Sequence, residues 1–192
     1  MTSKQRRPDK HSIREQVFPF EMAFPATMDQ QRLLLSYPLF FRAARHPLTY
    51  LSNLGYWGIQ CGPGWHQIVE KAASEIETEL QGLLERLNNT FELASVDRRL
   101  QRLPAVPKRG DEGHEDGETV LIPFCSEIKV AEGELHIGVC SGYLCDWPTW
   151  QRIRAAVMKA QLEAKTRCER CGKPGLLRVG YWERVYCAGC AG

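Results

Sequence analysis

The chain has 192 residues, of which 43% are hydrophobic and 25% are charged, as in ordinary globular proteins. Its formal net charge of +2 provides no global attraction for nucleic acid. No apolar run approaches the roughly 18 residues of a membrane span, and no apolar signal-peptide core follows the basic start. We therefore predict a cytoplasmic protein with one domain of ordinary size and a small appendage.

The first part of the chain is predicted to be partly helical. Residues 1–16 are polar and basic, which indicates a disordered tail. Residues 17–25 are apolar but interrupted by prolines, so we expect an extended segment that lies on a core. Asp29 is expected to cap a short helix from Gln30 to about Tyr37, which Pro38 ends.

The longest predicted helix follows an aromatic, glycine-rich stretch. Residues 55–66 contain too many glycines for a regular element, and we expect an irregular segment there. Residues 65–87 have apolar side chains at i, i+3, i+4 and i+7, which predicts an amphipathic helix. A second helical stretch, 91–103, stops before Pro104. The acidic residues of the long helix are expected largely on its solvent side: Glu70, Glu75, Glu77, Glu79 and Glu85.

The apolar period then changes from helical to extended. A proline-, glycine- and charge-rich loop, 104–117, leads into two predicted strands, 119–130 and 134–140. Gly133 suits the turn of the hairpin that would join them. Pro123 cannot donate a ladder hydrogen bond, which suggests an edge strand or a bulge at that point.

One further helix precedes the C-terminal segment. Asp146 is a suitable N-cap, and Pro148 suits the first turn. The helix is expected to run to about Thr166 and to lead directly to Cys168. Its apolar side would consist of Trp150, Ile153, Val157 and Ala160.

The last 25 residues contain two Cys-x-x-Cys pairs, separated by fifteen residues. This spacing is typical of a structural zinc site with four thiolate ligands, although the pattern alone does not exclude iron. Residues 176–179 and 183–186 can form a hairpin between the two pairs, as in a zinc ribbon. The predicted ligands of one structural Zn²⁺ are Cys168, Cys171, Cys187 and Cys190.

A second candidate site is the pair Cys61 and His66, which could act as nucleophile and base in a cysteine-dependent enzyme. They flank Gly62-Pro63-Gly64, a loop that can expose backbone amides at a helix start. The alternative is that Cys61 packs as a small hydrophobic residue while the loop sets a turn. Nothing in the sequence marks a third, orienting residue.

The remaining cysteines have no clear metal spacing. Cys140 and Cys145 could form a second metal site with Cys125, His136 or Cys61. Because these residues are far apart in sequence, buried free thiols are the favoured interpretation.

Aromatic and basic residues suggest a surface that binds a partner. Trp182 lies between Arg178 and Arg184 in the basic C-terminal segment, and Trp57 lies in the glycine-rich stretch. Aromatic side chains dominate protein interfaces, which favours a protein partner. An aromatic residue beside arginines can also stack on bases and neutralise phosphate, so nucleic acid remains an alternative.

Three stretches carry a resemblance: Trp57-Gly-Ile-Gln-Cys-Gly-Pro-Gly-Trp65, Ile128-Lys-Val-Ala-Glu-Gly-Glu-Leu-His-Ile137 and Cys168-Glu-Arg-Cys-Gly-Lys-Pro-Gly175. In this order they resemble a family of uncharacterised bacterial and phage-encoded proteins. The family often ends in Cys-x-x-His, where this chain has Cys190. The resemblance implies the hairpin, the metal knuckle and an origin in a phage or mobile element, but it supplies no reaction.

Together these features predict an α+β protein with a helical N-terminal part, a β-hairpin and helix, and a C-terminal zinc ribbon. We expect a basic tail (1–16), an α+β domain (17–166) and the ribbon (167–192). The leading hypothesis is a non-enzymatic zinc-containing binding protein that acts on a host or defence protein. Nucleic-acid binding through the ribbon and a Cys61/His66 enzyme are the alternatives, and the sequence leaves the oligomeric state open.

Overall fold

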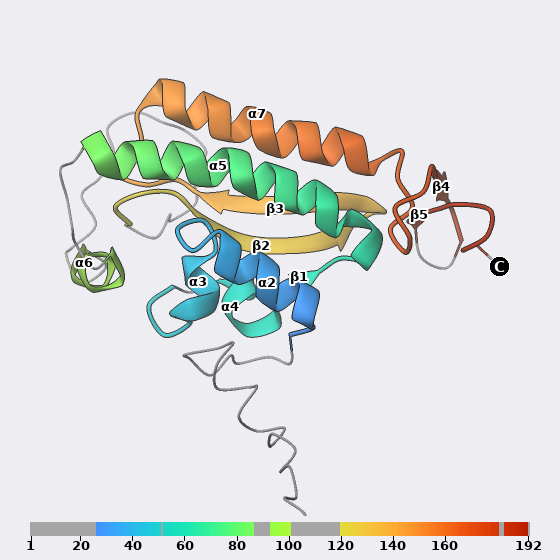
Figure 1. The fold of residues 1–192 in the computed structure, drawn as a ribbon, viewed down its shortest axis with the longest axis horizontal. Coiled ribbons are helices and arrows are strands. Elements are labelled where there is room, and N and C mark those ends of the chain that lie inside the picture. Colours follow the sequence, from blue (N-terminus) through green and yellow to red (C-terminus); the bar gives the residue numbers. More distant parts are fainter. Residues whose placement is uncertain (1–25, 51, 87–92, 101–119, 181–182, 192) are drawn as a thin grey trace, which may run out of the picture.

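The computed structural model describes residues 26–50, 52–86, 93–100, 120–180 and 183–191. It is an α+β structure, as predicted (Figure 1). In Figure 1, helices α5 and α7 lie side by side along the top of the molecule, and α2, α3 and α4 gather below them, with α2 joined to α5 by the Arg32–Glu70 ion pair at 3.2 Å. The predicted tail, 1–16, and the proline-rich stretch, 17–25, lie outside the described residues. Within the described part, no helix is long and apolar enough to cross a membrane.

The sheet is built around the predicted hairpin. Strands β2 (Phe124–Ala131) and β3 (Glu134–Cys140) pair antiparallel, with Ile128 opposite Ile137. Glu132 and Gly133 both have positive φ values, 51° and 73°, as a two-residue turn that matches the strand twist requires.

The third strand comes from the glycine-rich stretch. Strand β1 (Ile59–Gln60) pairs parallel to β2, so β2 is the central strand of the order β1-β2-β3. Pro123 immediately precedes β2, and the register of the β2–β3 pairing shifts between Cys125 and Glu127, close to the predicted bulge.

Helices α5 (His66–Arg86) and α7 (Trp147–Ala164) run antiparallel to each other. Asp146 caps α7 as predicted, because its carboxylate accepts the Thr149 N–H at 2.7 Å. A row of ion pairs links the two helices along their length. The pairs are Lys71–Glu163 at 2.9 Å, Glu75–Lys159 at 2.6 Å, Glu79–Arg152 at 2.8 Å and Arg86–Asp146 at 3.2 Å.

The N-terminal helices differ in detail from the expectation. Helix α2 spans Met28–Ser36, and its N-cap is Thr27 rather than Asp29, because the Thr27 hydroxyl accepts the Gln30 N–H. The stretch expected to be irregular contains a helix, α4 (Asn53–Trp57), and a 3₁₀ turn, η1 (Pro63–Trp65), besides β1. Two short helices, α3 (Arg42–Arg45) and α6 (Leu93–Leu100), complete the described elements outside the ribbon.

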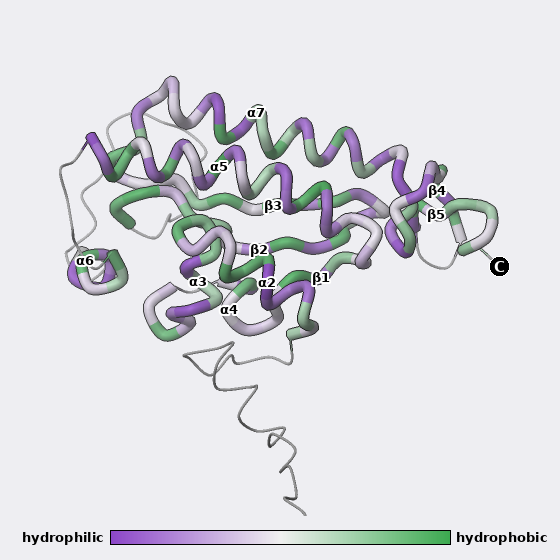
Figure 2. Tube along the Cα trace, viewed as in Figure 1, coloured by the Kyte–Doolittle hydropathy of each residue, from purple (hydrophilic) through white to green (hydrophobic). Residues whose placement is uncertain are grey.

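The main core lies between the α5–α7 pair and the sheet. In Figure 2, hydrophobic positions recur along both helices and along the two long strands. Trp65 begins the buried side of α5 and is fully enclosed. The largest other members are Leu34, Phe40, Phe41, Leu54, Ile76, Leu80, Ile122, Ile128 and Leu135.

The predicted solvent exposure was wrong for one acidic residue of α5. Glu77 is 4% exposed and faces the protein instead of solvent. Its two carboxylate oxygens accept the backbone N–H groups of Leu39 (3.0 Å) and Phe40 (2.8 Å). Burial raises the pKa of Glu77, and the hydrogen bonds from the two amides oppose this rise. The carboxylate in turn gives these amides the acceptors that the turn before α3 cannot provide itself.

A buried charge network joins segments that are distant in sequence. The guanidinium of Arg42 donates to the backbone carbonyls of Leu39, Ile122 and Pro123. Its Nε atom lies 3.4 Å from a carboxylate oxygen of Asp97, and both side chains are almost completely buried.

A tyrosine completes this network. The Tyr50 hydroxyl accepts from Arg42 at 3.0 Å and donates to Asp97 at 2.5 Å, and burial raises the pKa of Tyr50. The other Asp97 oxygen accepts the Leu121 N–H at 2.7 Å. The network thus fastens α6 and the start of β2 to α3.

We expect Asp97→Ala to lower the free energy of unfolding by about 3–5 kcal/mol, because it leaves a buried guanidinium without its counter-ion. Urea denaturation followed by circular dichroism measures the change. The control is Glu70→Ala, which removes a partly exposed ion pair with Arg32 and should cost less than about 1 kcal/mol. Equal costs for the two variants would contradict this account of Asp97.

Candidate metal centre

The four predicted ligands come together at the C-terminal end of α7. Cys168 and Cys171 follow this helix, and Cys187 and Cys190 follow β5. Strands β4 (Leu176–Arg178) and β5 (Arg184–Tyr186) pair antiparallel between the two cysteine pairs, which is the predicted ribbon.

The sulfur atoms are arranged as a metal site requires. The four Sγ atoms lie within 4.8 Å of one another, and those of Cys171 and Cys187 are 3.6 Å apart. A tetrahedral site with metal–sulfur bonds of about 2.3 Å has sulfur–sulfur separations of about 3.8 Å. Four thiols at these separations can hold one metal ion.

The backbone of residues 168–172, which we call the metal knuckle, favours the thiolate form of Cys168. Burial opposes ionisation of Cys168, but backbone hydrogen bonds from Cys187, Cys171 and Arg170 together lower its pKa to about 6. Gly172 has a φ of 74°, which closes the turn after Cys171 in a conformation that favours glycine. The knuckle is therefore shaped to present sulfur and amide groups to one point.

The knuckle sits directly on the glycine loop before α5 (Figure 1). Gly64 donates its N–H to the Glu169 carbonyl at 2.8 Å, and Gly62 donates to the Glu169 carboxylate at 3.1 Å. The indole Nε1 of Trp65 donates to the Arg167 carbonyl at 2.7 Å. We call Gly62, Pro63 and Gly64 the glycine seat.

Two positions of the glycine seat, Gly62 and Gly64, require residues without side chains. A Cβ atom on Gly64 would lie 2.3 Å from the Cys168 carbonyl oxygen and 2.3 Å from the Gly172 nitrogen. A Cβ on Gly62 would lie 2.4 Å from the Glu169 carbonyl oxygen. Both separations are too short for real contacts, so the backbone of the metal knuckle occupies the space that a side chain would need.

Glu169 links the glycine seat to the ribbon sheet. Its side chain is 8% exposed, and its carboxylate pairs with Arg184 at 3.0 Å. Its backbone N–H donates to the Val185 carbonyl at 2.8 Å. Glu169 thus bonds both to the glycine seat and to strand β5.

A second contact joins the ribbon to the β2–β3 turn. A Cβ on Gly133 would lie 2.6 Å from a Leu177 methyl group and 3.2 Å from Glu183. Lys165, after α7, pairs with Glu134 at 2.6 Å. The ribbon is therefore fixed to the core at two places.

Cys61 and His66 lie beside the glycine seat, but their environment disfavours catalysis. Burial, together with the nearby Glu169 carboxylate, raises the pKa of the Cys61 thiol to about 12. Burial also lowers the pKa of His66, whose ring is hydrogen-bonded to the backbone of Cys61. A thiol of this kind is protonated at neutral pH.

The other cysteines form no second metal cluster within the described ranges. Cys125 is fully buried, and Cys140 and Cys145 are partly buried against the two hydrophobic clusters. Burial raises the pKa of Cys125 and of Cys145. His136 instead contacts Glu127 at 3.2 Å.

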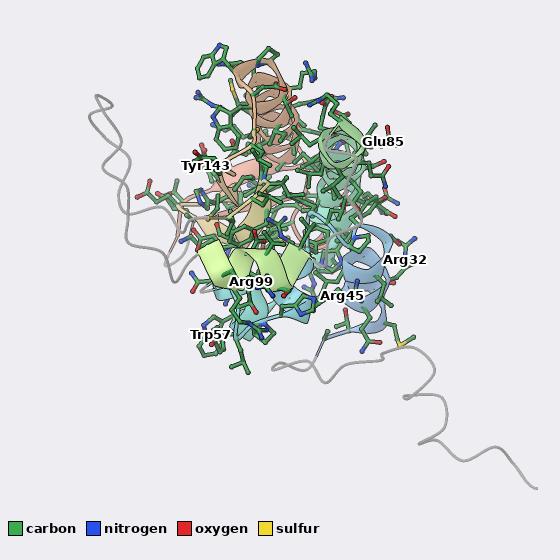
Figure 3. The ribbon with its side chains drawn as sticks, turned by 90° about the vertical axis from the view of Figure 1, so that its left-hand side faces the viewer. Arg32, Arg45, Trp57, Glu85, Arg99 and Tyr143 are labelled. Atoms are coloured by element: carbon green, nitrogen blue, oxygen red, sulfur yellow. The ribbon has the colours of Figure 1, made fainter. Side chains whose placement is uncertain are left out.

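Of the predicted partner-binding residues, Trp57 and Arg178 lie on different parts of the described structure. Trp57 is 66% exposed on α4, at the edge opposite α7 in Figure 3, whereas Arg178 is exposed on β4. α4 and the ribbon lie apart in Figure 1. The Arg184 guanidinium forms an ion pair with the Glu169 carboxylate, and Trp182 lies outside the described residues.

The sequence patterns missed two features near the candidate sites. Glu169 was not singled out, although a carboxylate inside a Cys-x-x-Cys pair is a visible signal. A shallow cavity of about 280 Å³ is lined by Ser52, Asn53, Tyr56, Ser126 and Glu127. Partial burial opposes ionisation of Glu127, but hydrogen bonds from Lys129 and Asn53 lower its pKa.

Comparison of the chain with protein-family models, with curated proteins and with solved structures returns no match.

Gly64→Ala is expected to lower the thermal midpoint of the whole core and to weaken metal retention. The added methyl group would clash with the backbone of Cys168 and Gly172 and displace the metal ligands. The matched control is Gly189→Ala, since a Cβ at Gly189 has nothing within 4 Å. Calorimetry and a competition titration with a metal-binding dye measure both effects. Equal midpoints and affinities in the two variants would show that the seat is not required.

Cys61 of the folded protein should resist alkylation at pH 8. A thiol with a pKa of about 12 is overwhelmingly protonated at that pH, and burial also restricts access to it. Iodoacetamide labelling followed by peptide mass spectrometry reports each cysteine separately, with the urea-unfolded protein as the control. Rapid labelling of Cys61 in the native protein would contradict this expectation and support Cys61 as a nucleophile.

Proposed function

We propose that the chain is a non-enzymatic binding protein whose C-terminal ribbon is held by one structural Zn²⁺. The single observation that carries this proposal is the closed cluster of four thiols within 4.8 Å. Four thiolates complete the tetrahedral shell that Zn²⁺ prefers and leave no coordination position for a substrate or an activated water. The metal then replaces the core that so short a segment lacks.

The ribbon also supplies the surface for a partner. Leu176, Leu177 and Val179 are 69%, 50% and 78% exposed on or next to β4. Because side chains alternate along a strand, Leu176 and Arg178 share one face of β4 and Leu177 lies on the other. Exposed apolar side chains on such a hairpin are suited to burial in a protein interface. Arg178, on the face of Leu176, adds a charged group that can give the interface specificity.

The partner proposed is a bacterial protein of host takeover or defence, which follows from the resemblance to bacterial and phage-encoded proteins. A cytoplasmic location is part of the same proposal, because a reducing compartment keeps four thiols available for metal.

Nucleic acid is the second candidate, and one observation favours it. Arg167, Arg170, Lys173 and Arg178 are all exposed, and none forms an ion pair among the described residues. Such a group can neutralise phosphates and would bind in a salt-dependent way. Arg184 contributes less to this candidate, because its pairing with Glu169 is part of the ribbon's own structure.

Two measurements test the proposal. Elemental analysis of protein purified without chelator should find one equivalent of zinc, and a lower content or an iron chromophore would refute the zinc assignment. Immobilised protein should then capture the same bacterial protein from repeated lysates. Leu176→Asp should abolish this capture, while Leu48→Asp, at an exposed leucine outside the ribbon, should preserve it.

The same experiment separates the two candidates. Retention of DNA or RNA at low salt, lost at high salt and weakened by Arg178→Ala, would favour nucleic acid instead. If no reproducible protein is captured and nucleic acid is not retained, the binding proposal fails.

A further inference from the structure

The cavity of about 280 Å³ lies between α4 and the first half of β2, and it takes no part in the metal centre. Its walls are polar except for one aromatic ring. The lining residues are Ser52, Asn53, Tyr56, Ser126 and Glu127. Side chains that donate and accept hydrogen bonds beside an aromatic ring are suited to a small polar ligand.

The β2 wall of the cavity is shaped by a bulge and by a glycine. Cys125 pairs with Val139 and Glu127 pairs with Gly138, so Ser126 is the extra residue of a bulge, which changes the direction of nearby side chains. A Cβ atom on Gly138 would lie 2.7 Å from the Ser126 Oγ and 2.8 Å from the Glu127 Cγ. The side chains of Ser126 and Glu127 therefore lie over the Gly138 backbone, in space that another residue at position 138 would fill.

The α4 wall is fixed by a capping bond and by a bond across the cavity. The Ser52 hydroxyl accepts the Gly55 N–H at 3.3 Å at the start of α4. Asn53 and Tyr56 are three positions apart, so they share one face of this helix. The Asn53 side-chain amide donates to the Glu127 carboxylate at 2.7 Å. The two walls are thus joined before a ligand arrives, which lowers the entropic cost of binding.

The carboxylate at the cavity already has a counter-ion. Lys129 Nζ lies 2.9 Å and His136 Nε2 lies 3.2 Å from one oxygen of Glu127. Lys129 is two residues from Glu127 on β2 and is paired with His136 on β3, so the three side chains share one face of the sheet. Because Glu127 and Lys129 together have no net charge, a free ion finds no uncompensated charge there. The cavity therefore favours a neutral ligand.

Three polar groups of the cavity bond to no other group among the described residues. They are the Tyr56 hydroxyl, the Ser126 hydroxyl and the carbonyl oxygen of the Asn53 side chain. The hydroxyls can donate and accept, whereas the carbonyl oxygen only accepts. Tyr56 is also 43% exposed, so its ring can pack against C–H groups of a ligand. A sugar ring combines a face of C–H groups with a rim of hydroxyls, and it matches this set of groups.

We propose that the cavity between α4 and β2 binds one ring of a neutral saccharide. Tyr56 packs against the C–H face of the ring, Ser126 and Asn53 bond to its hydroxyls, and Glu127 holds Asn53 in place. A volume of about 280 Å³ is just below the range of sites for drug-sized molecules, so it suits a single ring. This inference goes beyond the proposed binding function and does not depend on it, because α4 and the ribbon lie apart (Figure 1).

Nuclear magnetic resonance titration of the ¹⁵N-labelled, zinc-loaded full chain tests the site. The probes are D-glucose, D-galactose, D-mannose and N-acetyl-D-glucosamine. We expect at least one of them to shift the amide signals of α4 and of the first half of β2 in a saturable way. The expected dissociation constant is about 1–10 mM, because an open cavity covers only one side of a single ring.

Substitutions at the cavity test the roles of the aromatic ring and of the hydroxyl. Tyr56→Ala should weaken binding of that sugar about tenfold or more, as the loss of a central aromatic contact does. Ser126→Ala removes one hydrogen-bonding group and should weaken binding by about 3- to 10-fold. The control is Tyr143→Ala, which removes a tyrosine that is 78% exposed outside the cavity and should leave the affinity unchanged. Unchanged thermal midpoints would verify that all three variants fold.

Several outcomes would overturn the proposal. One is the absence of a saturable shift with all four sugars at about 100 mM, a concentration well above the expected dissociation constants. Equal losses in Tyr56→Ala and Tyr143→Ala, or shifts confined to other elements, would place the sugar elsewhere. Sodium acetate, methylammonium chloride and uridine are the competing probes. If one of these saturates the same amide signals and no sugar does, the cavity selects an ion or a nucleobase.

Discussion

The close contact between the metal knuckle and the glycine seat is the constraint on which the arrangement of the two parts depends. Backbone amides of Gly62 and Gly64 bond to Glu169, while Trp65 bonds to Arg167. Since a Cβ on Gly64 would collide with the knuckle backbone, the two segments approach as closely as main chains can. The same contact lies at the start of α5 and beside the first two metal ligands, so direct hydrogen bonds join the core to the ribbon.

The metal centre and the buried charge network stabilise different parts of the structure in different ways. The ribbon contributes Cys168 and Val185 as buried apolar side chains, which is too little for a fold of its own size without a metal. At the far end of the sheet, Arg42 and Asp97 are buried together and are surrounded by hydrogen-bond partners. A fully paired network of this kind fixes which segments meet, although it need not add net stability over an apolar core.

Most long elements were predictable, because their signals are local. The apolar period of α5, the turn at Gly133, the cap at Asp146 and the spacing of the four cysteines each depend on a few neighbouring residues. The errors arose where a distant segment decided the outcome. Glu77 has the sequence setting of a solvent-facing residue, yet it is buried because the amides of residues 39 and 40 need an acceptor.

The sequence by itself therefore determined the long helices α5 and α7, the β2–β3 hairpin, the ribbon and the identity of four candidate metal ligands, because spacing and periodicity are properties of the chain alone. Tertiary structure decided the rest. The sequence suggested that residues 62–64 could belong to a catalytic loop, but in the structure they contact the metal knuckle. Glu169 lies more than 100 positions away in the sequence and meets these residues only after folding. Arg184 looked like a contact for a partner but pairs with the same carboxylate, because the β4–β5 hairpin brings it there.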